Sequence, residues 1–218
     1  MYLYIIIASN FLCNYPSRER ELIATEKMKG NMKKRLIVFL LTIIFINFIL
    51  ASPIEWFTDQ ENNHANFGLD YQMAQSFTIG TLTENKDYKL ISVKLKLYRN
   101  HEVGQVIVSI KEANATGPFG PDLSTGTING NIITTDFVNG GEWYEINMSP
   151  YILQNSTTYA IVVRAPNSDF HSSLTWKGVN LYTNYIGGKE FFSENSGNIW
   201  LDGSNVLITD FLFEVLVE

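Results

Sequence analysis

The sequence predicts an all-β protein, an antiparallel β-sandwich or jelly roll, and three observations support this. Apolar and polar residues alternate with a period of two in five runs, over residues 93–98, 105–111, 143–148, 159–164 and 210–217. Period two is typical of strands with one face in a core. Turns rich in Gly, Pro and Asn separate these runs, and no segment beyond residue 52 keeps helical spacing over three turns. Short strands without intervening helices favour a sandwich.

Composition supports a folded core and places the domain boundaries. Apolar residues make up 45% of the 218 residues and charged residues 17%, so the chain can bury a core. The alternation starts near residue 69, which predicts one β-sandwich domain over residues 69–218. Residues 52–68 are mostly polar and are predicted to be a lead-in segment that docks through Trp56.

The N-terminal segment resembles an export signal. Lys33, Lys34 and Arg35 precede an apolar run over 36–50, and two small residues, Ala51 and Ser52, follow it. This layout over residues 32–51 is typical of a hydrophobic helix that serves as a signal peptide, and the alternative is a retained membrane anchor. Residues 1–31 are then an upstream extension, with Met28 or Met32 as the natural start. We therefore expect an extracellular or cell-surface protein.

Charge and cysteine content exclude several classes of function. The residues after Ala51 include 9 Lys and Arg against 19 Asp and Glu, a formal charge of −10. Nucleic acids and anionic lipids bind clustered basic residues, so neither is an expected partner. Contact with a membrane is expected only through the N-terminal hydrophobic segment. The only cysteine is Cys13, which leaves no disulfide or thiolate metal site beyond residue 51.

The order of several landmarks along residues 69–217 resembles a known family. They are Gln75-Ser76-Phe77, the runs 93–98 and 106–110, Gly120-Pro121-Asp122-Leu123, Ser124–Thr127, Trp143-Tyr144, Thr157–Val163, Trp176, Gly187-Gly188, Trp200 and Asp210–Phe213. Together they are similar to the secreted prokaryotic jelly-roll domains called "choice-of-anchor" domains, which resemble carbohydrate-binding modules. The resemblance implies a β-sandwich with a surface role and carbohydrate binding.

One short motif has two interpretations. Residues 193–200 resemble the Asp-box of sialidases, with Asn195 in place of the aspartate. A glycan-processing enzyme is one interpretation, but sialidases repeat the box and this chain has one copy. We favour a structural hairpin in which Asn195 bonds the turn, Gly197 adopts a positive φ, and Ser193 and Trp200 complete the motif.

Catalytic patterns are weak. A glycosidase needs two carboxyls about 5–9.5 Å apart. Glu142 and Glu145 face opposite sides of a predicted strand, while Asp210 and Glu214 lie about 13 Å apart along one. A pair of catalytic carboxyls on two neighbouring strands stays an alternative. The histidines, which are His64, His101 and His171, match no zinc or triad pattern. The sequence therefore predicts no catalytic residues, and a glycan hydrolase is the least favoured alternative.

Aromatic and amide residues form the predicted ligand site. Sugars stack on exposed rings, and their hydroxyls bond to nearby polar groups. The segment 176–185 offers both, and Trp143 adds a ring on the polar face of its strand; the alternative is that these rings are core residues. The predicted ligand-binding residues are Trp176, Asn180, Tyr182, Asn184, Tyr185 and Trp143.

Other sites are expected to be structural or absent. Asp122, Asp202 and Asp210 could supply oxygen ligands to a structural Ca²⁺, although no EF-hand spacing is present, and no other cofactor is expected. Glycosylation sequons begin at Asn114, Asn147 and Asn155.

Taken together, these patterns predict an exported, non-catalytic surface module. Its expected partner is an extracellular glycan or a surface protein. A structural surface or virion component that mediates protein–protein contacts is the main alternative.

Overall fold

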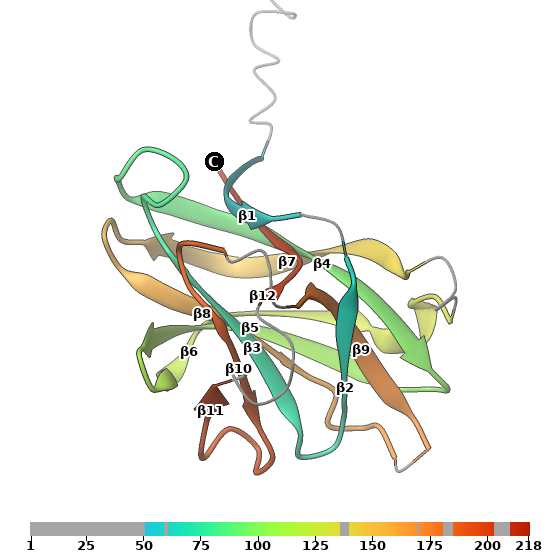
Figure 1. Cartoon of the computed structure of the whole chain (residues 1–218). Helices are drawn as coiled ribbons and strands as arrows, with labels where there is room; N and C mark the ends of the chain where they lie inside the picture. Colours follow the sequence, from blue (N-terminus) through green and yellow to red (C-terminus); the bar gives the residue numbers. More distant parts are fainter. Residues whose placement is uncertain (1–50, 59–60, 136–139, 170, 181–184, 203–209) are drawn as a thin grey trace, which may run out of the picture. The chain divides into compact units, whose positions relative to one another are not determined.

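The computed structural model describes residues 51–58, 61–135, 140–169, 171–180, 185–202 and 210–218. These residues form two antiparallel β-sheets, shown in Figure 1, and none of them is α-helical. The predicted β-sandwich is therefore confirmed. The upstream extension and all but the last residue of the predicted signal or anchor segment lie outside the described residues. In the described ranges, no helix is long and apolar enough to cross a membrane.

The first sheet contains seven strands and the second contains six. In the first sheet the order is β1 (Ser52–Phe57), β13 (Phe213–Val217), β4 (Tyr88–Asn100), β9 (Ser173–Val179) and β12 (Asp210–Phe211), with β2 (Asn63–Phe67) beside β9 and β7 (Glu142–Leu153) beside β4. In the second sheet it is β11 (Leu201–Asp202), β10 (Glu190–Ser193), β3 (Gln72–Thr78), β8 (Thr158–Arg164), β5 (Gln105–Asn114) and β6 (Gly117–Asn129). A 3-10 turn, η1 (Gly130–Ile132), follows β6.

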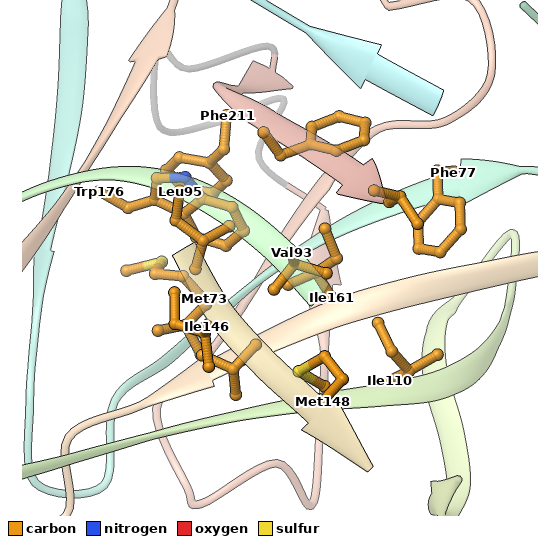
Figure 2. Close-up of a cluster of buried hydrophobic side chains, with 14 of the residues drawn as sticks. Met73, Phe77, Val93, Leu95, Ile110, Ile146, Met148, Ile161, Trp176 and Phe211 are labelled. Carbon is orange, nitrogen blue, oxygen red and sulfur yellow. The ribbon is translucent and has the colours of Figure 1, made fainter. Parts of the chain in front are cut away.

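The core lies between the two sheets and follows the alternation of the sequence. Val93, Leu95 and Leu97 on β4 are fully buried, while Lys94 and Lys96 between them remain partly exposed. Figure 2 shows how side chains from both sheets meet in this layer, with Ile110 and Ile161 from one sheet and Ile146 and Val93 from the other. Four of the five alternating runs of the sequence each lie within one strand of the sandwich, and the run over 210–217 is divided between β12 and β13.

The prediction of a polar lead-in over residues 52–68 is wrong. Residues 52–57 form β1, which pairs with β13, and residues 63–67 form β2, which pairs with β9. The sequence Asn63-His64-Ala65-Asn66 carries few apolar residues, so its alternation gives no strand signal. It is a strand because its backbone completes the edge of β9, an interaction between residues more than 100 positions apart.

The sandwich is closed along one side by contact between β6 and β7. A Cβ atom at Gly126 would lie 2.4 Å from the carbonyl oxygen of Asn147, so only glycine permits this approach. The Ser149 hydroxyl donates to the Thr125 carbonyl at 3.0 Å, and the Ser124 hydroxyl donates to the Ser149 carbonyl. On another side, β2 and β12 of the first sheet and β3 and β10 of the second line a cavity.

Candidate functional site

The cavity between β2, β12, β3 and β10 has a volume of about 260 Å³. Met73 and Phe211, both buried, give it an apolar interior, and Phe191 lines it from β10. Tyr71 also lines it, with 47% of its surface exposed. The other lining residues are His64, Ala65, Asn66, Glu190, Phe192 and Glu194. The cavity thus combines an accessible ring with carboxyl groups, while the His64 and Asn66 side chains alternate with the core-facing Ala65 and point to the other face of their sheet.

Turns next to the cavity are tied together by hydrogen bonds. The Tyr71 backbone N–H donates to the Gly68 carbonyl at 3.0 Å, closing the turn before β3. Ser196 bonds Asp70 twice, through its backbone N–H to the carbonyl at 2.8 Å and through its hydroxyl to the carboxylate at 2.7 Å. Between β2 and β9, Asn66 Oδ1 accepts from the Thr175 hydroxyl at 2.6 Å. These bonds fix the backbone that carries Tyr71 and Glu194.

Burial and charge determine the protonation of two residues that line the cavity, the buried Glu190 and the exposed His64. Burial raises the pKa of Glu190 to about 8, and the carboxylates of Asp210 and Asp202 raise it further against the opposing effect of Lys189. Burial and the nearby Lys177 ammonium lower the pKa of His64. At neutral pH, Glu190 is therefore mostly protonated and His64 mostly neutral.

A buried polar network lies next to Glu190 and joins the two sheets. Asp210 on β12 accepts from the Tyr185 backbone N–H at 2.8 Å and from Gln75 Nε2 on β3 at 2.9 Å. Gln75 Oε1 in turn accepts from the Phe211 backbone N–H at 2.7 Å. Burial raises the pKa of Asp210 to about 7, although these hydrogen bonds oppose the shift. Because both oxygens of Asp210 are bonded within the core, we assign it a structural role.

The structure places two of the predicted platform residues, Trp176 and Tyr185, in the core. Trp176 has no exposed surface; its ring stacks on Phe211 with a centroid distance of 4.5 Å, and its Nε1 donates to the Leu212 carbonyl. Tyr185 is also buried, and its hydroxyl bonds Glu55. Asn180 is half-buried. Tyr182 and Asn184 lie outside the described residues. Trp176 and Tyr185 are therefore core residues, because the sheets close over them.

Trp143 occupies the face that its alternation indicates. It lies opposite Lys96 in the β4–β7 pairing, and 38% of its surface is exposed. Since Tyr144 packs against the core, Trp143 points away from it. It does not line the cavity, so the exposed rings of Tyr71 and Trp143 belong to different surfaces.

The hairpin over residues 193–200 has the contacts that a structural role requires. Asn195 Oδ1 accepts from the Ile199 backbone N–H at 2.8 Å, and the Ser193 hydroxyl accepts from the Gly197 N–H at 2.9 Å. Gly197 adopts a φ of 82°. Trp200 packs against a small cluster on the other face of the second sheet that includes Phe191 and Val162. The motif thus holds β10 and β11 together.

The three candidate Ca²⁺ ligands belong to separate networks. Asp122 pairs with Arg164 at 2.8 Å and Lys111 at 3.2 Å, and Asp202 pairs with Lys189 at 3.2 Å. Asp210 is bonded as described above. Within the described ranges, no three His, Cys, Asp or Glu residues are grouped in a way that could hold a metal ion.

The remaining candidates lie on the surface. Asn114, Asn147 and Asn155 are all exposed. His101 and His171 line a second, more polar pocket together with Arg99 and Asp169, away from the cavity. The Arg99 guanidinium is already bonded to the carbonyls of Ile133, His101 and Asn131, so it holds loops together.

Sequence reasoning missed Tyr71, Glu190 and Glu194. One signal was available: Gln75 is a polar residue between Met73 and Phe77, at an inward position of its strand. A polar inward position marks a buried network, and Glu190 pairs with Gln75 in register. The approach of Tyr71 to β2 depends on tertiary structure and has no local signal.

No family model matches the chain, and no curated protein matches it. Among solved structures, the chain is similar to the cysteine protease and lectin-like domains of Cwp84, a surface layer associated protein of Clostridium difficile, with 11% identity, a TM-score of 0.46, and coverage of 74% of this chain and 37% of that one. It is also similar to SACOL2612, a CocE/NonD family hydrolase from Staphylococcus aureus, with 11% identity, a TM-score of 0.35, and coverage of 78% and 37%. The matches span little more than a third of either protein, and a likeness this distant carries no functional argument.

Proposed function

We propose that the chain is an exported, non-catalytic surface module that binds carbohydrate in the cavity between β2, β12, β3 and β10. The observation that carries the proposal is the exposed Tyr71 ring beside Glu190 and Glu194 on an apolar interior. An aromatic ring packs against the C–H face of a sugar, and amide and carboxyl groups bond its hydroxyls. The export part of the proposal rests on the signal-like sequence over residues 32–51.

The size of the cavity sets the size of the ligand. Its volume of about 260 Å³ is just below the roughly 300–1,000 Å³ of most small-molecule sites. A single sugar ring is therefore the expected occupant, with the rest of a glycan extending over the surface past Tyr71.

The spacing of the cavity carboxyls supports binding without hydrolysis. Glu190 lies on β10 and Glu194 in the bend that follows it, four residues later, so their Cα atoms can lie up to about 13 Å apart. A glycosidase pair requires about 5–9.5 Å. Asp210, the other acid with a raised pKa, is buried with both oxygens bonded. The proposed site therefore recognises its ligand and leaves it unchanged.

A glycan array, probed with and without Ca²⁺, tests the proposal. We expect binding to at least one glycan class, and we expect Tyr71→Ala to weaken it by about tenfold or more, equivalent to about 1.4 kcal/mol. Trp143→Ala is the matched control, because it removes a comparably exposed ring outside the cavity. Binding that survives Tyr71→Ala, or is lost in Trp143→Ala, would contradict the assignment to the cavity.

Exposed apolar side chains favour a second candidate, a structural component that contacts other protein subunits. Ile199 is 61% exposed and Leu201 48%, and Leu201 belongs to β11, an edge strand of its sheet. Exposed edges can pair with another chain. This candidate predicts concentration-dependent self-association in analytical ultracentrifugation that the double variant Ile199→Ser/Leu201→Ser abolishes. A monomer at all concentrations would argue against self-assembly.

A further inference from the structure

Glu190 is a carboxyl group in the cavity that lacks a side-chain partner among the described residues. Only 6% of its surface is exposed, and it lines the cavity with Tyr71 and Glu194. Apart from its own backbone N–H, no described residue donates a hydrogen bond to it. Because Glu190 lines the cavity, its carboxyl is in a position to pair with a ligand group there.

The charged groups around Glu190 make the cavity attractive to a cation. Asp202 on β11 adds negative charge near Glu190, and Glu194 adds more at the cavity itself. The Lys189 ammonium interacts with the Asp202 carboxylate at 3.2 Å and lies 5.1 Å from the Phe191 ring centroid. None of the described residues that line the cavity is Lys or Arg.

We propose that the cavity takes a protonated primary amine carried by a sugar, so that its ligand is an amino sugar with a free ammonium group. This inference rests on the proposed function. The ammonium would pair with the Glu190 carboxylate, and the Tyr71 ring would stabilise it through a cation–π contact. The residues after Ala51, with a formal charge of −10, would steer a polycationic glycan toward the protein.

Binding of an ammonium group is expected to release a proton from the Glu190 carboxyl. Because the pKa of Glu190 is about 8 in the free protein, its carboxyl is protonated in mildly acidic solution. Pairing with a cation favours the ionised carboxylate, so the site releases up to about one proton per ligand bound. A neutral sugar would leave Glu190 protonated and release none.

Two ligands that differ only at the amine provide the test. Isothermal titration calorimetry compares a β-1,4-linked glucosamine tetramer with the N-acetylglucosamine tetramer at about pH 6, where the amine of the first is charged. The protein is purified after expression of the full chain. Each titration is repeated in two buffers with different heats of ionisation, so that proton release is measured directly.

We expect the glucosamine tetramer to bind at least about tenfold more tightly and to release about one proton. Glu190→Gln keeps the shape of the side chain and should remove both the preference and the proton release. Glu112→Gln is the matched control, because Glu112 is an exposed residue on β5 outside the cavity. Comparing the two tetramers on the wild-type protein already tests the amine assignment, so that test does not depend on whether a variant folds.

The outcomes separate this inference from the proposed function. Equal affinity for the two tetramers, or a preference that survives in Glu190→Gln, would overturn the amine assignment. If another glycan binds in a Tyr71-dependent manner while neither tetramer does, the proposed function stands and the amine assignment fails. If no glycan binds, both fail.

Discussion

The Tyr185 hydroxyl donates a hydrogen bond of 2.6 Å to the carboxylate of Glu55, a residue 130 positions earlier in the chain. The other oxygen of Glu55 accepts from the backbone N–H groups of Gly80, Thr81 and Leu82 at 3.1, 2.9 and 3.3 Å. Glu55 has no exposed surface. Its burial is tolerated because both oxygens are bonded, and it fixes β1 to the loop after β3.

Removing the Tyr185 hydroxyl is expected to destabilise the fold. Tyr185→Phe leaves one oxygen of a buried carboxyl without its donor, which should lower the free energy of unfolding by about 1–3 kcal/mol. Urea unfolding followed by tryptophan fluorescence measures the change. Tyr71→Phe is the control, because its side chain is exposed and a surface change of this kind stays within about 0.5 kcal/mol. Equal effects in the two variants would show that the Glu55 contact contributes nothing.

Trp176 is expected to stabilise the core. Trp176→Ala removes a fully buried ring that stacks on Phe211, so the free energy of unfolding should fall by about 3–5 kcal/mol. Chemical denaturation would measure it. Trp176→Phe, which keeps an aromatic ring but loses the bond from Nε1 to the Leu212 carbonyl, should cost less. A fully stable Trp176→Ala variant would contradict the packing described for this residue.

The close approach of β6 and β7 predicts a large effect from one added methyl group. Gly126→Ala would place a Cβ 2.4 Å from the Asn147 carbonyl oxygen and 2.8 Å from Ile146 Cγ2, and overpacking of this kind costs about 1–3 kcal/mol or more. Gly120→Ala serves as the comparison. Gly120 has a φ of 71° but open space around it, so only backbone strain of about 1 kcal/mol applies. Thermal unfolding of the two variants should rank Gly126→Ala as the less stable.

The raised pKa values of Asp210 and Glu190 predict that stability falls as pH rises. In the folded protein these groups keep their protons up to pH values of about 7 and 8, while their ordinary pKa values are 3.8 and 4.5. Between those limits the folded state binds more protons than the unfolded state, so the free energy of unfolding decreases with pH by up to about 1.4 kcal/mol per pH unit for each group. His64, whose pKa is lowered, has the opposite but weaker effect, since its side chain is largely exposed.

Urea unfolding between about pH 5 and pH 8 measures this slope, and Glu190→Gln separates the contributions. The variant cannot ionise at position 190, so its slope should be clearly shallower than that of the wild-type protein. An unchanged slope would show that Glu190 titrates normally in the folded state.

The strands and the core could be predicted from local sequence, whereas the site could not. The alternation of residues such as Val93, Leu95 and Leu97 indicates which face of a strand is buried, and a few neighbouring residues are enough to show it. Trp143 was placed on the correct face for the same reason. β2 was missed because its stability comes from pairing with β9, and its own residues are mostly polar.

The error at Trp176 has a physical cause. Trp176 and Tyr185 flank a polar segment that reads as a surface loop in the sequence, and rings near such loops can be either exposed or buried. The burial of Trp176 depends on Phe211, which is 35 residues later in the chain and belongs to β12. The cavity, similarly, is formed by residues from both sheets, and no local pattern records how they are brought together.

The pairing of β1 with β13 determines how the sandwich responds to mechanical force. Ser52 lies opposite Val217 in this antiparallel pair, so the start of β1 and the end of β13 lie side by side. A force that pulls Ser52 and Val217 apart would therefore load their hydrogen bonds one after another, in the manner of a zipper. Sequential rupture needs less force than shearing all the bonds of a strand at once. The body should yield by peeling β1 away first, which would expose β13 while the remaining strands stay folded.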